Sequence, residues 1–169
     1  MIILGFFLIK HIQLTLREIA RLSIEAQERI SLLNQMKIFQ DSLPDKPIFF
    51  ITGNSEYYSV KSLHVPFQQG VGYTLMAWFA NSSKIPVALL GTDPPFLWDV
   101  YEEGYKTIGT KGFGFFYDYN DLLKFMSENS SISPKQVVAF YYDSNSKMLS
   151  SISEKVQENL ISHTPFSQK

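Results

Sequence analysis

The densest group of side chains that could do chemistry lies between Asp93 and Glu103. Four carboxylates alternate here with aromatic rings: Asp93, Asp99, Glu102 and Glu103 with Phe96, Trp98 and Tyr101. Carboxylates beside aromatic rings often line sugar-binding clefts, and a carboxylate pair can run acid–base chemistry on glycosides. The commoner explanation is a charged rim around a proline-rich loop. For a small ligand, the candidate binding residues are Tyr57, Tyr58, His64, Gln68, Asp93, Trp98, Asp99 and Glu102.

Other chemical signals in the sequence are weaker. The three histidines, His11, His64 and His163, are not spaced as metal ligands. Gly70-Val71-Gly72 precedes a predicted helix, but the third glycine of a dinucleotide fingerprint is replaced by Leu75. The chain has no cysteine, so thiolate chemistry and Cys-ligated zinc are excluded. We therefore expect no metal and no cofactor, and the sequence assigns no catalytic residue.

The composition indicates a folded domain with a dense aromatic core. The 169 residues include 14 Phe, 9 Tyr and 2 Trp, and each such side chain buries a large area. Charged residues make up only 18%, and the formal net charge is −1. Without a basic excess, broad nucleic-acid binding is not expected.

The N-terminal part reads as one long helix with two possible roles. Met1–Ile9 is apolar apart from one glycine, which predicts a contact with a membrane, either through this run or through a segment upstream of it. Residues 10–39 contain no Gly or Pro. Apolar and small residues recur there at alternating spacings of three and four: Ile9, Ile12, Leu16, Ile19, Ser23, Ala26, Ile30 and Leu33. This coiled-coil-like stripe predicts either packing on the chain's own domain or self-association through helix 9–33.

The rest of the chain predicts an α+β domain. Asp41–Pro47 marks a boundary, Pro47–Thr52 a buried strand, Tyr73–Ala80 a helix and Gly104–Asp118 a hairpin. A helix over Tyr119–Glu128, strands at Val137–Tyr142 and Lys147–Ile152, and a helix over Ser153–Ile161 follow. The β-α-β-β-α-β order predicts a mixed, mainly antiparallel sheet with helices on one face, and the alternative is a three-layer α/β fold. We divide the chain into a helix and stalk (1–40), the domain (41–163) and a frayed tail (164–169).

Three segments together resemble a known family. They are Leu43–Gly53 (LPDKPIFFITG), Pro66–Tyr73 (PFQQGVGY) and Gly112–Tyr117 (GFGFFY), preceded by the apolar helix end and the long helix. This organisation resembles the C-terminal extramembrane domain of multi-spanning prokaryotic membrane proteins, notably dolichyl-phosphate-mannose-type glycosyltransferases. The family's catalytic acids lie between earlier transmembrane helices, so the resemblance implies an accessory domain and carries over no catalytic residue.

The resemblance also implies a location outside the cytoplasm. Lys10, His11, Arg17 and Arg21 follow the apolar run, and positive residues at that point favour the cytoplasmic side instead. We expect a membrane-associated protein with an extracytoplasmic domain.

Three functions follow as hypotheses. The first is a non-catalytic accessory or recognition domain tethered to a membrane. The others are a small free-standing enzyme acting on a sugar or phosphate compound, and a dimerising interaction module.

Overall fold

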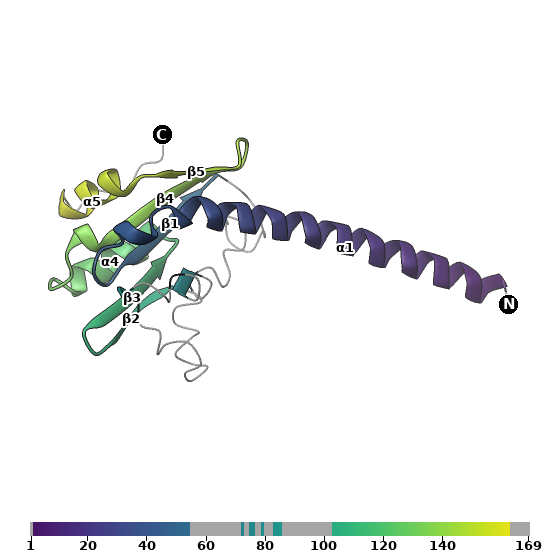
Figure 1. Ribbon diagram of the computed structural model, residues 1–169, viewed down its shortest axis with the longest axis horizontal. Coiled ribbons are helices and arrows are strands. Elements are labelled where there is room, and N and C mark those ends of the chain that lie inside the picture. The colour runs from purple at the N-terminus through teal and green to yellow at the C-terminus, as the bar shows by residue number, and fades with distance from the viewer. Residues whose placement is uncertain are drawn as a thin grey trace.

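A single long helix projects from a small sheet domain (Figure 1). The computed structural model describes residues 2–54, 72, 75–76, 79, 83–85 and 103–162. Helix α1 runs from Ile2 to Lys37 without interruption, and its 36 residues correspond to a length of about 54 Å. A short 3₁₀ turn, η1 (Gln40–Ser42), then leads the chain into the sheet.

The sheet has five strands in the order β2-β3-β1-β4-β5. Their bounds are β1 Ile48–Gly53, β2 Gly104–Ile108, β3 Lys111–Phe116, β4 Val137–Asp143 and β5 Met148–Ser151. Strand β1 lies at the centre and runs parallel to both neighbours, β3 and β4. Two antiparallel hairpins, β2–β3 and β4–β5, form the edges of the sheet.

Two helices follow the predicted positions closely. Helix α4 spans Tyr119–Glu128, and Asp118 is its N-cap, with a side chain that accepts hydrogen bonds from the N–H groups of Asn120 and Asp121. Helix α5 spans Ser153–Ser162. The Ser153 hydroxyl accepts a 2.9 Å hydrogen bond from the backbone N–H of Ala139, which joins the start of α5 to β4.

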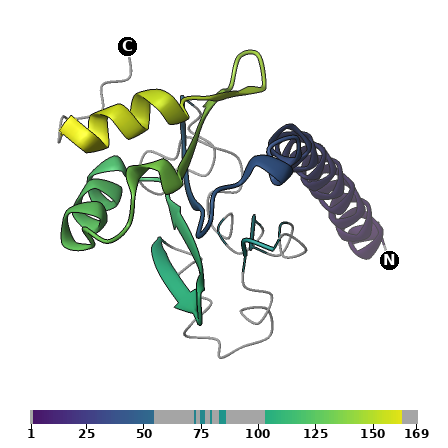
Figure 2. The same cartoon turned by 60° about the vertical axis from the view of Figure 1, so that its left-hand side comes forward.

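The sheet separates two hydrophobic cores. One packs the C-terminal turns of α1 on the sheet through Leu32, Leu33 and Met36, together with Leu75, Met76 and Phe79. The other packs α4 and α5 on the opposite face through Leu122, Met126, Val156 and Leu160. Figure 2 shows α1 in purple on one side of the sheet, with α4 in green and α5 in yellow on the other. Every residue of β1 is buried because both faces of this strand are covered.

The predicted α+β class and the order of strands after the long helix are confirmed. The pairing differs from a mainly antiparallel sheet, because two of the four strand pairs are parallel. The prediction of helices on one face fits α4 and α5. The other face of the sheet is covered by α1 together with Leu75, Met76 and Phe79. The physical reason lies in β1, whose continuous apolar run is typical of a parallel strand buried on both faces. The frayed tail expected at 164–169 lies outside the described residues.

The β2–β3 hairpin depends on one tyrosine ring that lies over two glycines. A Cβ atom at Gly114 would lie 2.9 Å from Cδ2 of Tyr105 and 3.1 Å from Cγ1 of Ile48, and one at Gly112 would overlap the Tyr105 hydroxyl. Only glycine fits under the ring at these positions. The Tyr105 hydroxyl oxygen is buried and has no hydrogen-bond partner among the described residues.

We expect Tyr105→Phe to raise the free energy of unfolding by about 1 kcal/mol, because an unsatisfied buried hydroxyl is removed and the ring is kept. Tyr105→Ala should lower it by about 3 kcal/mol, because the ring that covers both glycines is lost. Urea denaturation of the two variants measures both effects. Destabilisation by Tyr105→Phe would mean that the hydroxyl has a partner that stabilises the fold.

Candidate functional site

The eight binding residues predicted from the sequence all lie outside the described residues, so their arrangement stays a prediction. They are Tyr57, Tyr58, His64, Gln68, Asp93, Trp98, Asp99 and Glu102. Glu103, the last member of the same acidic group, is described and lies directly before β2. Two surfaces of the described part of the chain are candidates for function: the free face of α1 and the carboxyl edge of the parallel strands.

The predicted stripe of α1 is exposed along its length, as are Leu14, Leu22 and Ile24 outside it. We use the name "α1 stripe" for Ile9, Ile12, Leu16, Ile19, Ser23, Ala26 and Ile30. The five large side chains of this stripe are each between 49% and 60% exposed. The predicted alternative, in which the stripe packs on its own domain, is therefore wrong for residues 9–30. Leu33 alone follows it, because this side chain is buried in the core.

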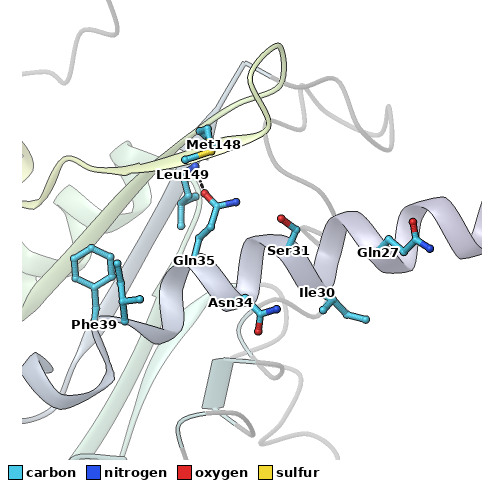
Figure 3. A pocket seen from close by; sticks show the side chains of 9 residues that line it. Gln27, Ile30, Ser31, Asn34, Gln35, Phe39, Met148 and Leu149 are labelled. Carbon is cyan, nitrogen blue, oxygen red and sulfur yellow. Dashed lines mark hydrogen bonds between the residues drawn. The ribbon is translucent and has the colours of Figure 1, made fainter.

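A groove lies where α1 meets the edge strand β5, with a volume of about 680 Å³. Its walls come from one face of α1, including Ile30 and Asn34, from Ile38 just after this helix, and from Met148 and Leu149 of β5. Figure 3 shows the Gln35 side chain pointing from α1 toward β5. Its Oε1 accepts a 2.8 Å hydrogen bond from the Leu149 N–H, and its Nε2 donates a 3.2 Å bond to the Lys147 carbonyl. The Gln35 amide thus covers part of an otherwise open strand edge.

A second polar contact fixes the direction in which α1 leaves the domain. The Tyr142 hydroxyl on β4 donates a 2.5 Å hydrogen bond to Oε1 of Glu28. Together with Gln35, this bond ties two turns of α1 to the sheet, in addition to the apolar contacts of Leu32, Leu33 and Met36. The bond at Glu28 is the first of these ties along α1, and the earlier part of the helix projects away from the domain (Figure 1).

The carboxyl ends of β1 and β4 meet at a polar cluster. Asp143 accepts hydrogen bonds from Nδ2 of Asn54 (3.0 Å), from the N–H of Asn145 (3.0 Å) and from the Ser146 hydroxyl (2.8 Å). Oδ1 of Asn54 accepts a further bond from the Ser144 N–H at 2.7 Å. These donors, led by the Ser146 hydroxyl, lower the pKa of Asp143 to about 2. Both carboxylate oxygens of Asp143 accept hydrogen bonds within the chain, so this side chain closes the β4–β5 turn.

Glu103 lies at the carboxyl end of β3, the edge where open α/β sheets bind ligands. Its Oε1 accepts hydrogen bonds of 2.7 Å from the N–H groups of Tyr117 and Asp118, just before α4. Burial raises the pKa of Glu103 to about 7 against the lowering effect of these two bonds, and the neighbouring Asp121 carboxyl raises it further. A carboxyl group with this pKa can donate or accept a proton near neutral pH.

The raised pKa makes a prediction for stability. The folded state binds the proton of Glu103 more tightly than the unfolded state, whose pKa is about 4.5. The stabilisation that protonated Glu103 gives to the folded state is therefore complete below pH 4.5. It is lost as the pH rises toward the folded-state pKa of about 7. A glutamine side chain at this position cannot ionise and keeps an oxygen for the two N–H groups. We expect Glu103→Gln to be more stable than the parent chain at pH 8 by about 1 kcal/mol, after discounting for partial exposure.

Urea denaturation at pH 4.5 and pH 8 measures this difference. The control is Glu158→Gln, which changes an exposed glutamate on α5 and should leave the pH dependence intact. Equal pH dependence in the parent chain and in Glu103→Gln would contradict the assignment.

Within the described residues, no group of His, Asp or Glu side chains is placed to hold a metal ion. The described helices include none that combines the length and apolar character needed to cross a bilayer. The sequence matches no protein-family model, and neither the curated proteins nor the solved structures give a significant match. The assignment of function therefore depends on the geometry of the chain itself.

Sequence reasoning missed the contacts of Gln35, Glu28 and Asn54, because each joins residues about 90 or more positions apart. No local pattern marks such pairs. An indirect sign of such contacts is a polar residue at the end of an apolar strand. Gly53-Asn54 and Asp143-Ser144 are two examples.

Proposed function

We propose that this chain is a non-catalytic accessory domain that α1 tethers to a membrane surface. On the basis of the resemblance to glycosyltransferase membrane proteins, the proposal also makes this chain the extramembrane part of a glycosyltransferase-like membrane protein. Its domain would then lie on the extracytoplasmic side. The observation that carries the proposal is the projection of α1. This helix buries only its last turns on the domain and leaves Ile9, Ile12 and the rest of the stripe exposed.

The far end of the helix has the composition of a membrane contact. Residues 1–9 are apolar apart from Gly5, and Lys10 and His11 follow directly. A helix end of this length rises about 13 Å, which suits insertion to the depth of the headgroup and acyl boundary. The cationic residues that follow suit the headgroup layer. The rigid helix would then hold the sheet domain away from the lipid surface.

Vesicle flotation with the full chain tests the tether. We expect the chain to float with phosphatidylcholine vesicles, and the triple variant Phe6→Gln, Phe7→Gln, Leu8→Gln to stay in the dense fraction. The matched control is Ile108→Gln, Met148→Gln, Ile161→Gln, which changes three exposed apolar side chains on the domain. Flotation of the control but not of the helix-end variant supports the tether. Equal behaviour of the two triple variants contradicts it.

A second candidate function is supported by Glu103 alone. Its position at the carboxyl edge of β3 and its pKa near 7 suit a general acid for a sugar or phosphate compound. Hydrolysis of nitrophenyl glycosides and nitrophenyl phosphate by the full chain tests this candidate. An activity that falls by about 10²-fold or more in Glu103→Gln would favour the enzyme over the accessory domain. An activity unchanged by this substitution would remove Glu103 from the reaction.

A further inference from the structure

The α1 stripe has the spacing that pairing between two identical helices requires. Ile9, Leu16, Ser23 and Ile30 recur every seven residues, and Ile12, Ile19 and Ala26 form a second series three residues later. These are the a and d positions of a heptad repeat, whose side chains meet along the seam of a coiled coil. The structure leaves these positions uncovered by the chain's own domain.

The charges of α1 lie away from this seam. The flanking e and g positions from Gln13 to Arg29 are Gln13, Thr15, Ala20, Leu22, Gln27 and Arg29. Only Arg29 among them is charged, and in a parallel pair its e-position neighbour is the neutral Asn34 of the second helix. Arg21 instead forms an ion pair with Glu18 on the outer face of the same helix. Two copies could therefore approach along the stripe without bringing like charges together.

A lipid surface is a poorer match for the stripe than a second copy. Helices that lie flat on a bilayer carry mostly Lys and Arg on their polar face. Residues 9–30 contain four basic residues and three acidic ones: Lys10, Arg17, Arg21 and Arg29, and Glu18, Glu25 and Glu28. This near balance suits a protein partner. A continuous apolar stripe of this length is also more than a monomer normally leaves in water.

The domain does not block the approach of a second helix. At about 100° per residue, Leu32 and Met36 lie about a third of a turn or more from the stripe, whereas Leu33, the next residue of the series after Ile30, is already buried against the domain. The groove at the base of α1 includes Ile30, the last residue of the stripe. A partner helix lying along the stripe would continue past this groove, where Ile38 and Met148 are exposed.

We propose that two copies of this chain associate side by side through the α1 stripe, as a parallel coiled coil over residues 9–30. The parallel direction rests on the proposed membrane tether, because both helix ends must then reach the same surface. The small residues Ser23 and Ala26 lie in the middle of the seam and make the pair weak enough to depend on concentration.

Disulfide crosslinking tests this pairing directly, because the chain has no cysteine of its own. Leu16→Cys places a thiol in the seam at an a position, where two parallel helices bring the Cα atoms within disulfide range. Leu14→Cys is the matched control: Leu14 is 61% exposed and Leu16 is 60% exposed, but Leu14 lies on the outer face. Both positions are exposed, so neither substitution disturbs the core.

We expect the full chain with Leu16→Cys to form a crosslinked dimer roughly tenfold faster than the chain with Leu14→Cys under mild oxidation. Equal rates, or no crosslink at position 16, would overturn the parallel pair. Sedimentation of Leu16→Gln beside Leu14→Gln gives a second measurement, and only the former should shift the chain to monomer. Flotation without crosslinking would reject the pair alone, whereas crosslinking without flotation would reject the membrane tether and keep the pair.

Discussion

Replacing Phe49 with alanine should lower the free energy of unfolding by about 3–5 kcal/mol, because a large cavity is left in a core that cannot collapse around it. Phe49 is the second residue of the central strand β1, pairs with Phe115 on one side and Val138 on the other, and is 1% exposed. Its ring stacks on Phe79 with centroids 5.7 Å apart and contacts Phe113 at the same distance. The substitution would remove ring contacts with Phe79 and with Phe113 of β3 at once.

Urea denaturation followed by circular dichroism measures this loss, and thermal unfolding should show a fall of about 10 °C or more. The control is Ile161→Ala on α5, whose side chain is largely exposed. That substitution should change the free energy of unfolding by less than about 0.5 kcal/mol. A small effect of Phe49→Ala would mean that β1 is not packed against the core on the α1 side of the sheet as described.

Leu32→Ala should have the second largest effect, about 3 kcal/mol, because Leu32 anchors α1 in the core beside Met36. Leu16→Ala removes the same side chain from the same helix at an exposed position. Measured on dilute protein, where a pair of copies is dissociated, this control should have almost no effect on domain stability. The contrast between the two leucines separates the anchored part of α1 from its projecting part.

The readout for both leucines is the urea midpoint of the domain, combined with limited proteolysis of α1. Leu32→Ala should expose the region before Pro44 to cleavage, because the helix loses its main apolar contact. Similar destabilisation by both substitutions would indicate that the stripe also packs on the domain.

Local elements of the fold could be predicted well from the sequence. The buried strand at Ile48–Gly53, the helix at Tyr119–Glu128 and the β2–β3 hairpin are each fixed by nearby residues. Strand direction is different, because it depends on where distant segments meet. The parallel pairing of β1 with β3 and β4 joins segments more than 60 residues apart. The buried pattern of β1 was the one local sign of this arrangement.

For the candidate surfaces too, the sequence indicates some features, and others depend on the fold. The α1 stripe could be recognised from its spacing, but its exposure could not, because the same spacing suits a helix packed on its own domain. The stripe is left exposed because Leu32 and Met36 are the side chains that pack on the sheet, whereas Ile30 is exposed. Glu103 was marked by composition, but its pKa follows from burial at the carboxyl edge of β3.

The two proposals about α1 support each other physically. A membrane tether would confine the chains to a surface and raise their effective concentration, which helps a weak helix pair to form. A pair of helices would in turn present two apolar ends to the bilayer. Each proposal still has its own readout, since flotation depends on residues 6–8 and crosslinking depends on Leu16.

The projection of α1 from the domain is the basis of both proposals, and small-angle X-ray scattering tests it most directly. Measured on the full chain in a monomeric fraction identified by light scattering, a projecting helix gives a radius of gyration of about 20 Å. A compact chain of 169 residues, with α1 folded back on the domain, gives about 15 Å. We expect the larger value together with a maximum dimension above the helix length of about 54 Å. A radius near 15 Å would contradict the free stripe and with it both proposed roles of the helix.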